Sequence, residues 1–395
     1  MEEWKECRLG EICTKITDGS HFSPQACQTG YPMFSVKDML EYGFDYSNCK
    51  HISAKDFESM KNGDCVPRKG DILVAKDGSF LKQIFECKET KKEAILSSIA
   101  MFRPNQDFIT PTFLCYLLKS PKVYNYIASN CVSGSALPRI VLKDFKKVSM
   151  QVPPLPTQQK IAAILSSLDD KIELNNKIND NLELQAQAIF KSWFVDFEPF
   201  GGEMPKDWKR TDIYSIANII YGSPFASKLF NSEKNGTPII RIRDLKDQHS
   251  DVYTPEVRDD AYLIQPKDIV VGMDGEFRPH IWGSEPGLLN QRVCVFENKR
   301  PKGKAFLYYS IKPLLDIVEK TQVATTVIHI GKKDFDKFQI TLPTKNVLDK
   351  FDELTDSVFD KIVNNRLENI RLEKLRDTLL PKLMSGEIDV DSVQP

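Results

Sequence analysis

The sequence DKIELNNKIND at residues 170–180 returns as DKIVNNRLENI at residues 360–370, shifted by 190 positions. Each copy lies within a longer run, 161–193 and 351–383, whose seam residues recur at alternating steps of three and four. This spacing is the heptad pattern of a coiled coil. The sequence therefore predicts two long helices that arose by duplication.

Each predicted helix carries two asparagines on its seam, at equivalent positions. A polar layer within an apolar seam lowers stability but fixes the register and orientation of two helices. An antiparallel pair lets the asparagines of one helix face those of the other, although each helix could instead pack separately on its own domain. The antiparallel register pairs Asn175 with Asn369, Asn179 with Asn365, Ile161 with Leu383 and Trp193 with Phe351.

Prolines and caps suggest where the helices begin and end. Proline is disfavoured inside helices, so Pro156 is expected to precede the first helix and Thr157 to cap it. Pro381 is expected to bend or end the second helix.

The segments before each helix also resemble one another. Runs such as 70–74 and 267–271 are typical of short buried strands and are followed by Asp-Gly turns, whereas 111–127 looks helical. The offset between the halves drifts from 197 to 206 there and becomes constant at 190 from residue 140 onward. We expect an α+β chain with pseudo-twofold symmetry: two similar mixed α/β domains, separated by two long helices that form an antiparallel coiled coil. The expected segments are 1–150 and 200–342 for the domains, and 151–199 and 343–395 for the helices.

Composition limits the possible surroundings of the chain. No stretch approaches the about 18 apolar residues that a membrane span requires. The nine cysteines contain no CxxC pair, so we expect free thiols and a cytoplasmic protein. The formal net charge of −1 is unusual for an isolated DNA-binding protein, which is normally basic.

Several motifs flank the seams: PPLPTQQKI at 153–161, MPKDWK at 204–209, NQRV at 290–293 and LRDTLLPKLMSGEI at 375–388. Together with the order of the segments, they resemble the specificity subunits of type I restriction–modification systems. The resemblance implies that each mixed α/β domain is a target recognition domain, which reads one half of a bipartite double-stranded DNA site. It also implies that the helices set the half-site spacing and dock two methyltransferase (modification) subunits, which restriction subunits then join. S-adenosylmethionine, ATP and Mg²⁺ would belong to these partners, and this chain would bind no cofactor, metal or membrane.

Candidate DNA contacts are basic, hydroxyl and imidazole side chains near turns at matched positions in both halves. In the first half they are Lys37, Lys76, Lys82, Ser135, Arg139, Lys143, Lys146 and Lys147. In the second half they are Arg241, Arg243, Arg278, His280, Thr325, His329, Lys332 and Lys333.

Two other functions remain open from the residues. Asp71 with Glu86 and Lys88 could form a metal-dependent nuclease site. The duplication argues against it, because at the offset of Asp71 and Asp268 the position of Glu86 falls on Gly283. A coiled-coil scaffold without DNA affinity is the second alternative.

Overall fold

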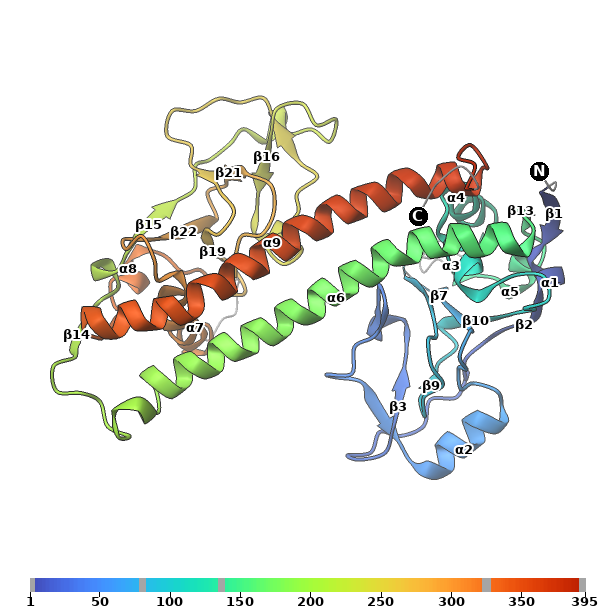
Figure 1. The fold of residues 1–395 in the computed structure, drawn as a ribbon, viewed down its shortest axis with the longest axis horizontal. Helices are drawn as coiled ribbons and strands as arrows, with labels where there is room; N and C mark the ends of the chain where they lie inside the picture. The colour runs from blue at the N-terminus through green and yellow to red at the C-terminus, as the bar shows by residue number, and fades with distance from the viewer. Residues whose placement is uncertain (1–3, 78–82, 134–138, 322–327, 391–395) are drawn as a thin grey trace. The chain divides into compact units, whose positions relative to one another are not determined.

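The computed structural model describes residues 4–77, 83–133, 139–321 and 328–390 (Figure 1). The chain divides into unit 1, Met1–Glu173 with Leu372–Pro395, and unit 2, Leu174–Arg371. Each unit combines one globular part with a stretch of both long helices. The expected segments treat each long helix as a separate segment. The compact units differ, because the boundary between them falls within both helices, after Glu173 and after Arg371.

A four-stranded antiparallel sheet lies at the centre of unit 1, in the order β2-β10-β7-β8. The strands are β2 (Cys13–Asp18), β7 (Ile72–Ala75), β8 (Ile84–Glu86) and β10 (Ile99–Pro104). All of β7 is buried. Because strand side chains alternate between faces, Ile72 and Val74 join the core with the helices, while Leu73 and Ala75 pack against the smaller sheet on the other face.

Short strands and helices complete unit 1. A second sheet has the order β6 (Lys50–Ile52), β3 (Tyr31–Phe34), β9 (Ala94–Ile95). The remaining strand pairs are β1 (Lys5–Arg8) with β13 (Ser149–Val152), β4 (Met39–Leu40) with β5 (Gly43–Phe44), and β11 (Val132–Ser133) with β12 (Arg139–Ile140). The helices are α1 (Leu9–Ile12), η1 (Val36–Asp38), α2 (Ala54–Asn62), α3 (Pro111–Lys119), α4 (Pro121–Asn130) and α5 (Leu142–Phe145).

Unit 2 repeats this plan. Its central sheet has the order β15 (Ala217–Tyr221), β22 (Val293–Asn298), β19 (Ile269–Gly272), β20 (Pro279–Ile281). The second sheet is β17 (Tyr253–Thr254), β16 (Thr237–Ile240), β21 (Gly287–Leu289), β18 (Leu263–Ile264), and β14 (Lys209–Asp212) pairs with β23 (Gln339–Leu342). The helices are η2 (Glu198–Phe200), η3 (Ile213–Ser215), η4 (Ser227–Leu229), η5 (Ile242–Asp244), α7 (Lys304–Thr321) and α8 (Lys332–Phe335). The matching strand orders confirm the predicted duplication and the α+β class.

The helical stretch predicted near 111–127 differs between the units. In unit 1 it is divided into α3 and α4, because Ser120 is extended and Pro121 begins the next helix. In unit 2 the single helix α7 continues through Pro313.

The two long helices are α6 (Leu155–Phe194) and α9 (Lys345–Met384), each 40 residues long and 190 positions apart. The expected first boundary was wrong: α6 begins before Pro156, which occupies the first turn, where no backbone donor is needed. Likewise, α9 continues past Pro381 to Met384. Within the described ranges no helix combines the length and apolarity that a membrane span requires.

The predicted antiparallel register is present in unit 2. Asn175 Nδ2 donates to Asn369 Oδ1 at 2.8 Å, and Asn365 Nδ2 donates to Asn179 Oδ1 at 2.9 Å. All four side chains are buried. Together with a distance of 6.0 Å between the ring centroids of Trp193 and Phe351, these bonds confirm mutual pairing of the two helices.

The same register holds where α6 and α9 pass through unit 1. Ile161 and Leu383 are buried in one core cluster, as the antiparallel pairing predicts. That cluster also contains residues of α3 and α5, so the globular part and the paired helices share a core. The alternative of two separately packed helices is thereby excluded within each unit.

Candidate nucleic-acid interface

In unit 1, Asp77 follows β7 and is bridged to the strand that precedes α5. The remainder of the predicted Asp-Gly turn lies outside the described residues. Asp77 and Arg139 form an isolated antiparallel bridge, and Ile140 N donates to Lys76 O at 2.9 Å. The Arg139 guanidinium donates to both carboxylate oxygens of Asp77, at 3.0 and 3.3 Å, yet its side chain is 63% exposed. The carboxylate therefore orients a cation that solvent can reach.

Unit 2 has a corresponding bridge between Asp274 and His329. His329 lies 190 positions after Arg139, and its Nδ1 contacts the Asp274 carboxylate while 56% of the side chain stays exposed. The guanidinium of Arg292 approaches the same carboxylate at 3.5 Å. Arg292 was not among the predicted contacts, although it lies within the NQRV motif. Each unit thus has an exposed nitrogen-bearing side chain held by an aspartate, Arg139 in unit 1 and His329 in unit 2.

These side chains suit the chemistry of base edges. A guanidinium can donate two bonds to guanine O6 and N7, and an imidazole can donate or accept one. A carboxylate partner restricts the rotamers of such a side chain and so lowers the entropy lost when it binds.

The short helices η1 and η5 present the next matched pair. Lys37 and Arg243 are both exposed beside a buried aspartate that caps the turn. Arg241 has a different role from the one predicted: its guanidinium bonds Asp244 at 2.8 and 2.9 Å within the same turn. We therefore assign Arg241 to local structure rather than to the DNA-facing set.

Lys76 is also corrected by the structure. Its side chain is only 5% exposed and its Nζ pairs with Asp18 Oδ2 at 2.9 Å. A side chain this enclosed cannot reach a phosphate, because its charge is already compensated at the end of β2.

The lysines around α5 and α8 remain accessible. Lys143, Lys146 and Lys147 in unit 1 are exposed, and so are Lys332 and Lys333 in unit 2. Exposed ion pairs are weak, so the 3.2 Å contact of Lys147 with Asp144 leaves this lysine available for phosphate contact.

Arg278 and His280 are the remaining two described candidates. Arg278 pairs with Asp316 at 2.6 Å and Glu319 at 3.1 Å, both on α7. His280 is partly buried, and this burial, with the positive charges of Arg366 and Arg278, lowers its pKa to about 4. His280 lines a cavity in unit 2 and is therefore removed from the exposed set. The predicted contacts Lys82, Ser135 and Thr325 lie outside the described residues.

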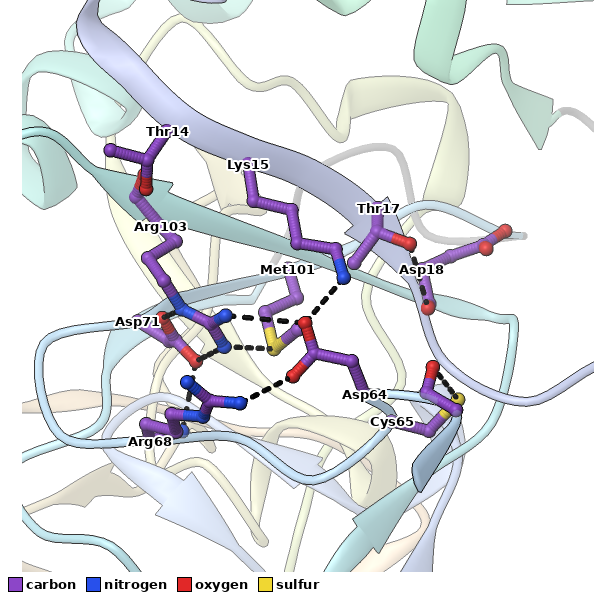
Figure 2. A network of polar contacts seen from close by, with 11 residues as sticks. Thr14, Lys15, Thr17, Asp18, Asp64, Cys65, Arg68, Asp71, Met101 and Arg103 are labelled. Carbon is purple, nitrogen blue, oxygen red and sulfur yellow. Dashed lines mark hydrogen bonds and ion pairs between the residues drawn. The ribbon is translucent and has the colours of Figure 1, made fainter. Parts of the chain in front are cut away.

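Asp71, the first residue of the possible nuclease site, is held by an arginine. Figure 2 shows the Arg103 guanidinium between Asp71 and Asp64, with bonds of 2.8 Å to both oxygens of Asp71. Asp71 is 1% exposed and also accepts from the backbone N–H of Arg68. An arginine in this position repels a divalent cation, so Asp71 stabilises the fold instead of holding a metal.

The rest of the trio is engaged as well. Glu86 accepts from Thr112 at 2.8 Å and pairs with Lys88 at 3.0 Å. The strand register further corrects its counterpart in unit 2: Glu86 pairs with Ile72 as Ile281 pairs with Ile269, so the equivalent is Ile281, not Gly283. Among the described residues no group of three or more histidine, cysteine, aspartate or glutamate side chains is placed to hold a metal, and the nine cysteines are free.

The fold defines a protein of two similar α+β modules, each with an exposed side chain bridged to an aspartate. The chain belongs to the family described as "Type I restriction modification DNA specificity domain", which matches residues 1–184 and 205–375. It is similar to the HindI specificity subunit of Haemophilus influenzae, with 26% identity over 478 aligned positions that cover 98% of this chain and all of the relative. It is also 29% identical to the MjaIX specificity subunit of Methanocaldococcus jannaschii, over 73% of this chain and 71% of the relative. A crystal structure of the type I specificity subunit from M. genitalium has the same fold, with a TM-score of 0.58, 16% identity, and coverage of 97% and 96%.

Proposed function

We propose that each unit reads one half of a bipartite double-stranded DNA site through the edge where an aspartate is bridged, Asp77 in unit 1 and Asp274 in unit 2. The observation that carries this proposal is the repetition of the bridge: Asp77 with Arg139, and Asp274 with His329. Because the partner side chain differs while the aspartate is kept, the two edges can discriminate different base pairs. The lysines near α5 and α8 would contact phosphates without sequence preference.

The paired helices would dock two methyltransferase subunits, to which restriction subunits attach, and their length would set the number of unread base pairs. In this arrangement the chain itself is non-catalytic and binds no cofactor. The partners would supply S-adenosylmethionine, ATP and Mg²⁺. The pairing of Arg103 with Asp71 supports a non-catalytic role, since Asp71 belongs to the nuclease-like set of Asp71, Glu86 and Lys88.

A footprint on target DNA tests the proposal directly. The assembled complex should protect two patches separated by unprotected bases, and exchange of residues 1–150 should change the sequence of one patch only. Absence of protection would favour a scaffold without DNA affinity. Cleavage of DNA by the isolated chain with Mg²⁺, lost in Glu86→Ala, would favour the nuclease alternative.

A further inference from the structure

The contact between the globular part and the paired helices is filled by polar side chains in unit 1. Asp169 of α6 accepts from Tyr116 OH at 2.7 Å, Tyr42 OH at 3.1 Å and Arg376 Nη1 at 2.8 Å. Burial, reinforced by neighbouring acidic groups including Asp169, raises the pKa of both tyrosines, so each remains a donor. Lys119 lies over both tyrosine rings, at 5.7 and 5.9 Å. One carboxylate therefore satisfies several convergent donors.

The duplication shows which residues take these places in unit 2. At the offset of the long helices, Phe359 replaces Asp169 and Ala186 replaces Arg376. At the offset of β3 and β16, Gln248 replaces Tyr42, while Tyr309 and Lys312 on α7 correspond to Tyr116 and Lys119 on α3. Unit 2 thus retains the tyrosine and lysine and lacks the carboxylate.

A cavity of about 260 Å³ lies at this position in unit 2. Phe359, Gln248, Tyr309 and Lys312 line it, as the correspondence with unit 1 requires. It is also bounded by the aromatic and imidazole rings of Tyr308 and His280 and by two arginines, Arg278 and Arg366.

The polar groups around this cavity are mostly donors. Lys312 Nζ, Tyr308 OH and the His280 ring have no hydrogen-bond or ion-pair partner within the described ranges. Glu183 is the one carboxylate in the lining, and it is engaged by Arg366 at 2.9 Å. The low pKa of His280, about 4, agrees with a site that is partly withdrawn from water and positive in potential.

We propose that this cavity in unit 2 binds a phosphate oxyanion, which takes the part that the Asp169 carboxylate plays in unit 1. Lys312, Tyr308 and His280 would donate to the oxygens, and Arg366 would contribute charge. The chemistry is that of a phosphate group, whether free in solution or on a nucleic-acid backbone. The lining of this cavity does not include Asp274 or His329, and the inference does not depend on the proposed DNA reading.

The test is an NMR titration of the full chain that follows the ring resonances of His280, assigned by comparison with His280→Gln. Inorganic phosphate should shift these resonances saturably and raise the pKa of His280, because a bound anion stabilises the imidazolium. Lys312→Gln should weaken phosphate binding by at least about tenfold. The matched control is Lys119→Gln, the equivalent lysine of unit 1, which should leave binding unchanged.

A variant that fills the cavity distinguishes phosphate binding there from a general effect of salt on the His280 resonances. Gln248→Tyr places the side chain of unit 1 in the cavity and should abolish the shift in a chain that remains folded by its NMR spectrum. A shift produced only by a short DNA duplex, with the same dependence on Lys312 and Gln248, supports a backbone phosphate as the source. No shift with either probe, a shift that survives Gln248→Tyr, or an equal shift with sodium chloride overturns the proposal. Since inorganic phosphate involves neither DNA nor a partner, this failure would leave the proposed function untouched.

Discussion

Units 1 and 2 share one topology, but different kinds of side chain fill the interface between the globular part and the paired helices. Where the globular part meets the paired helices, unit 1 buries an ion pair between Asp169 and Arg376, whereas unit 2 places Phe359 and Ala186 at those positions. Removal of one partner from a buried pair is costly, although replacement of both by apolar residues often is not. The comparison shows that backbone topology tolerates either solution, provided that the side chains complement each other.

Loss of the buried hydrogen bonds and ion pair of Asp169 should have the largest effect on the free energy of unfolding. Asp169→Ala leaves Arg376 and two tyrosine hydroxyls without their shared acceptor, and we expect a loss of about 3–5 kcal/mol in the unfolding free energy of unit 1. Urea unfolding, with hydrogen exchange of α3 and α4, measures this loss. The double variant Asp169→Phe with Arg376→Ala introduces the residues of unit 2 and should cost much less. Equal losses in the two variants would contradict the comparison.

The second prediction uses pH to separate the units. His280 occupies the strand position that Phe85 occupies in unit 1, and its pKa is depressed from the unfolded value near 6.5 to about 4. A depressed histidine pKa contributes stability that is present above pH 6.5 and lost as pH falls toward 4, because the unfolded chain takes up the proton first. The loss should reach about 3 kcal/mol in unit 2.

Fluorescence of the buried Trp282, two residues from His280, reports unfolding of unit 2 during such a pH series. His280→Phe should remove this part of the acid sensitivity without a change in unit 1. If the variant has the same pH profile as the parent chain, the assignment to His280 is wrong.

The third prediction compares the two bridges. Arg139→Ala should weaken specific binding by about 1–3 kcal/mol and relax the preference at one base pair of one half-site. His329→Ala should do the same in the other half-site only. Methylation maps produced by complexes with each variant reveal the relaxed position, and Asp77→Asn serves as a control that keeps the arginine. Relaxation in both half-sites from one variant would contradict independent reading.

The smallest effects are expected at the exposed lysines. Lys146→Ala and Lys333→Ala should each weaken binding by less than about 1 kcal/mol, equally for target and non-target DNA, since phosphate contacts carry no sequence information. The slope of affinity against salt should decrease by about one for each lost contact. Fluorescence anisotropy across a salt series measures both quantities.

Some of this organisation follows from local sequence. The constant offset and the heptad spacing were sufficient to pair Asn175 with Asn369 and Asn179 with Asn365, because helix geometry fixes which side chains share a face. The strand runs in both halves were recognisable for the same reason, since four consecutive apolar residues need cover on both faces.

The burial of individual side chains and their ion-pair partners did not follow from the local sequence. Lys76 precedes Asp77 directly, and Arg139 follows 62 residues later but is bridged to Asp77 in the fold. Lys76 is nevertheless enclosed beside Asp18, whereas Arg139 is exposed on Asp77. The counterpart of Glu86 moved by two residues because a loop changes length between the paired strands. Such outcomes depend on contacts between distant segments.

The sequence by itself determined that the chain is duplicated and that each half ends in a helix, and it favoured antiparallel pairing of these helices through an asparagine layer. A repeat with a constant offset and a heptad seam are local regularities that need no knowledge of the third dimension. Only the tertiary structure decided that Asp169 lies among tyrosines while Phe359 lines a cavity, and which cations stay exposed. The burial of a side chain depends on the residues that surround it in the fold, and these residues are far apart in the sequence.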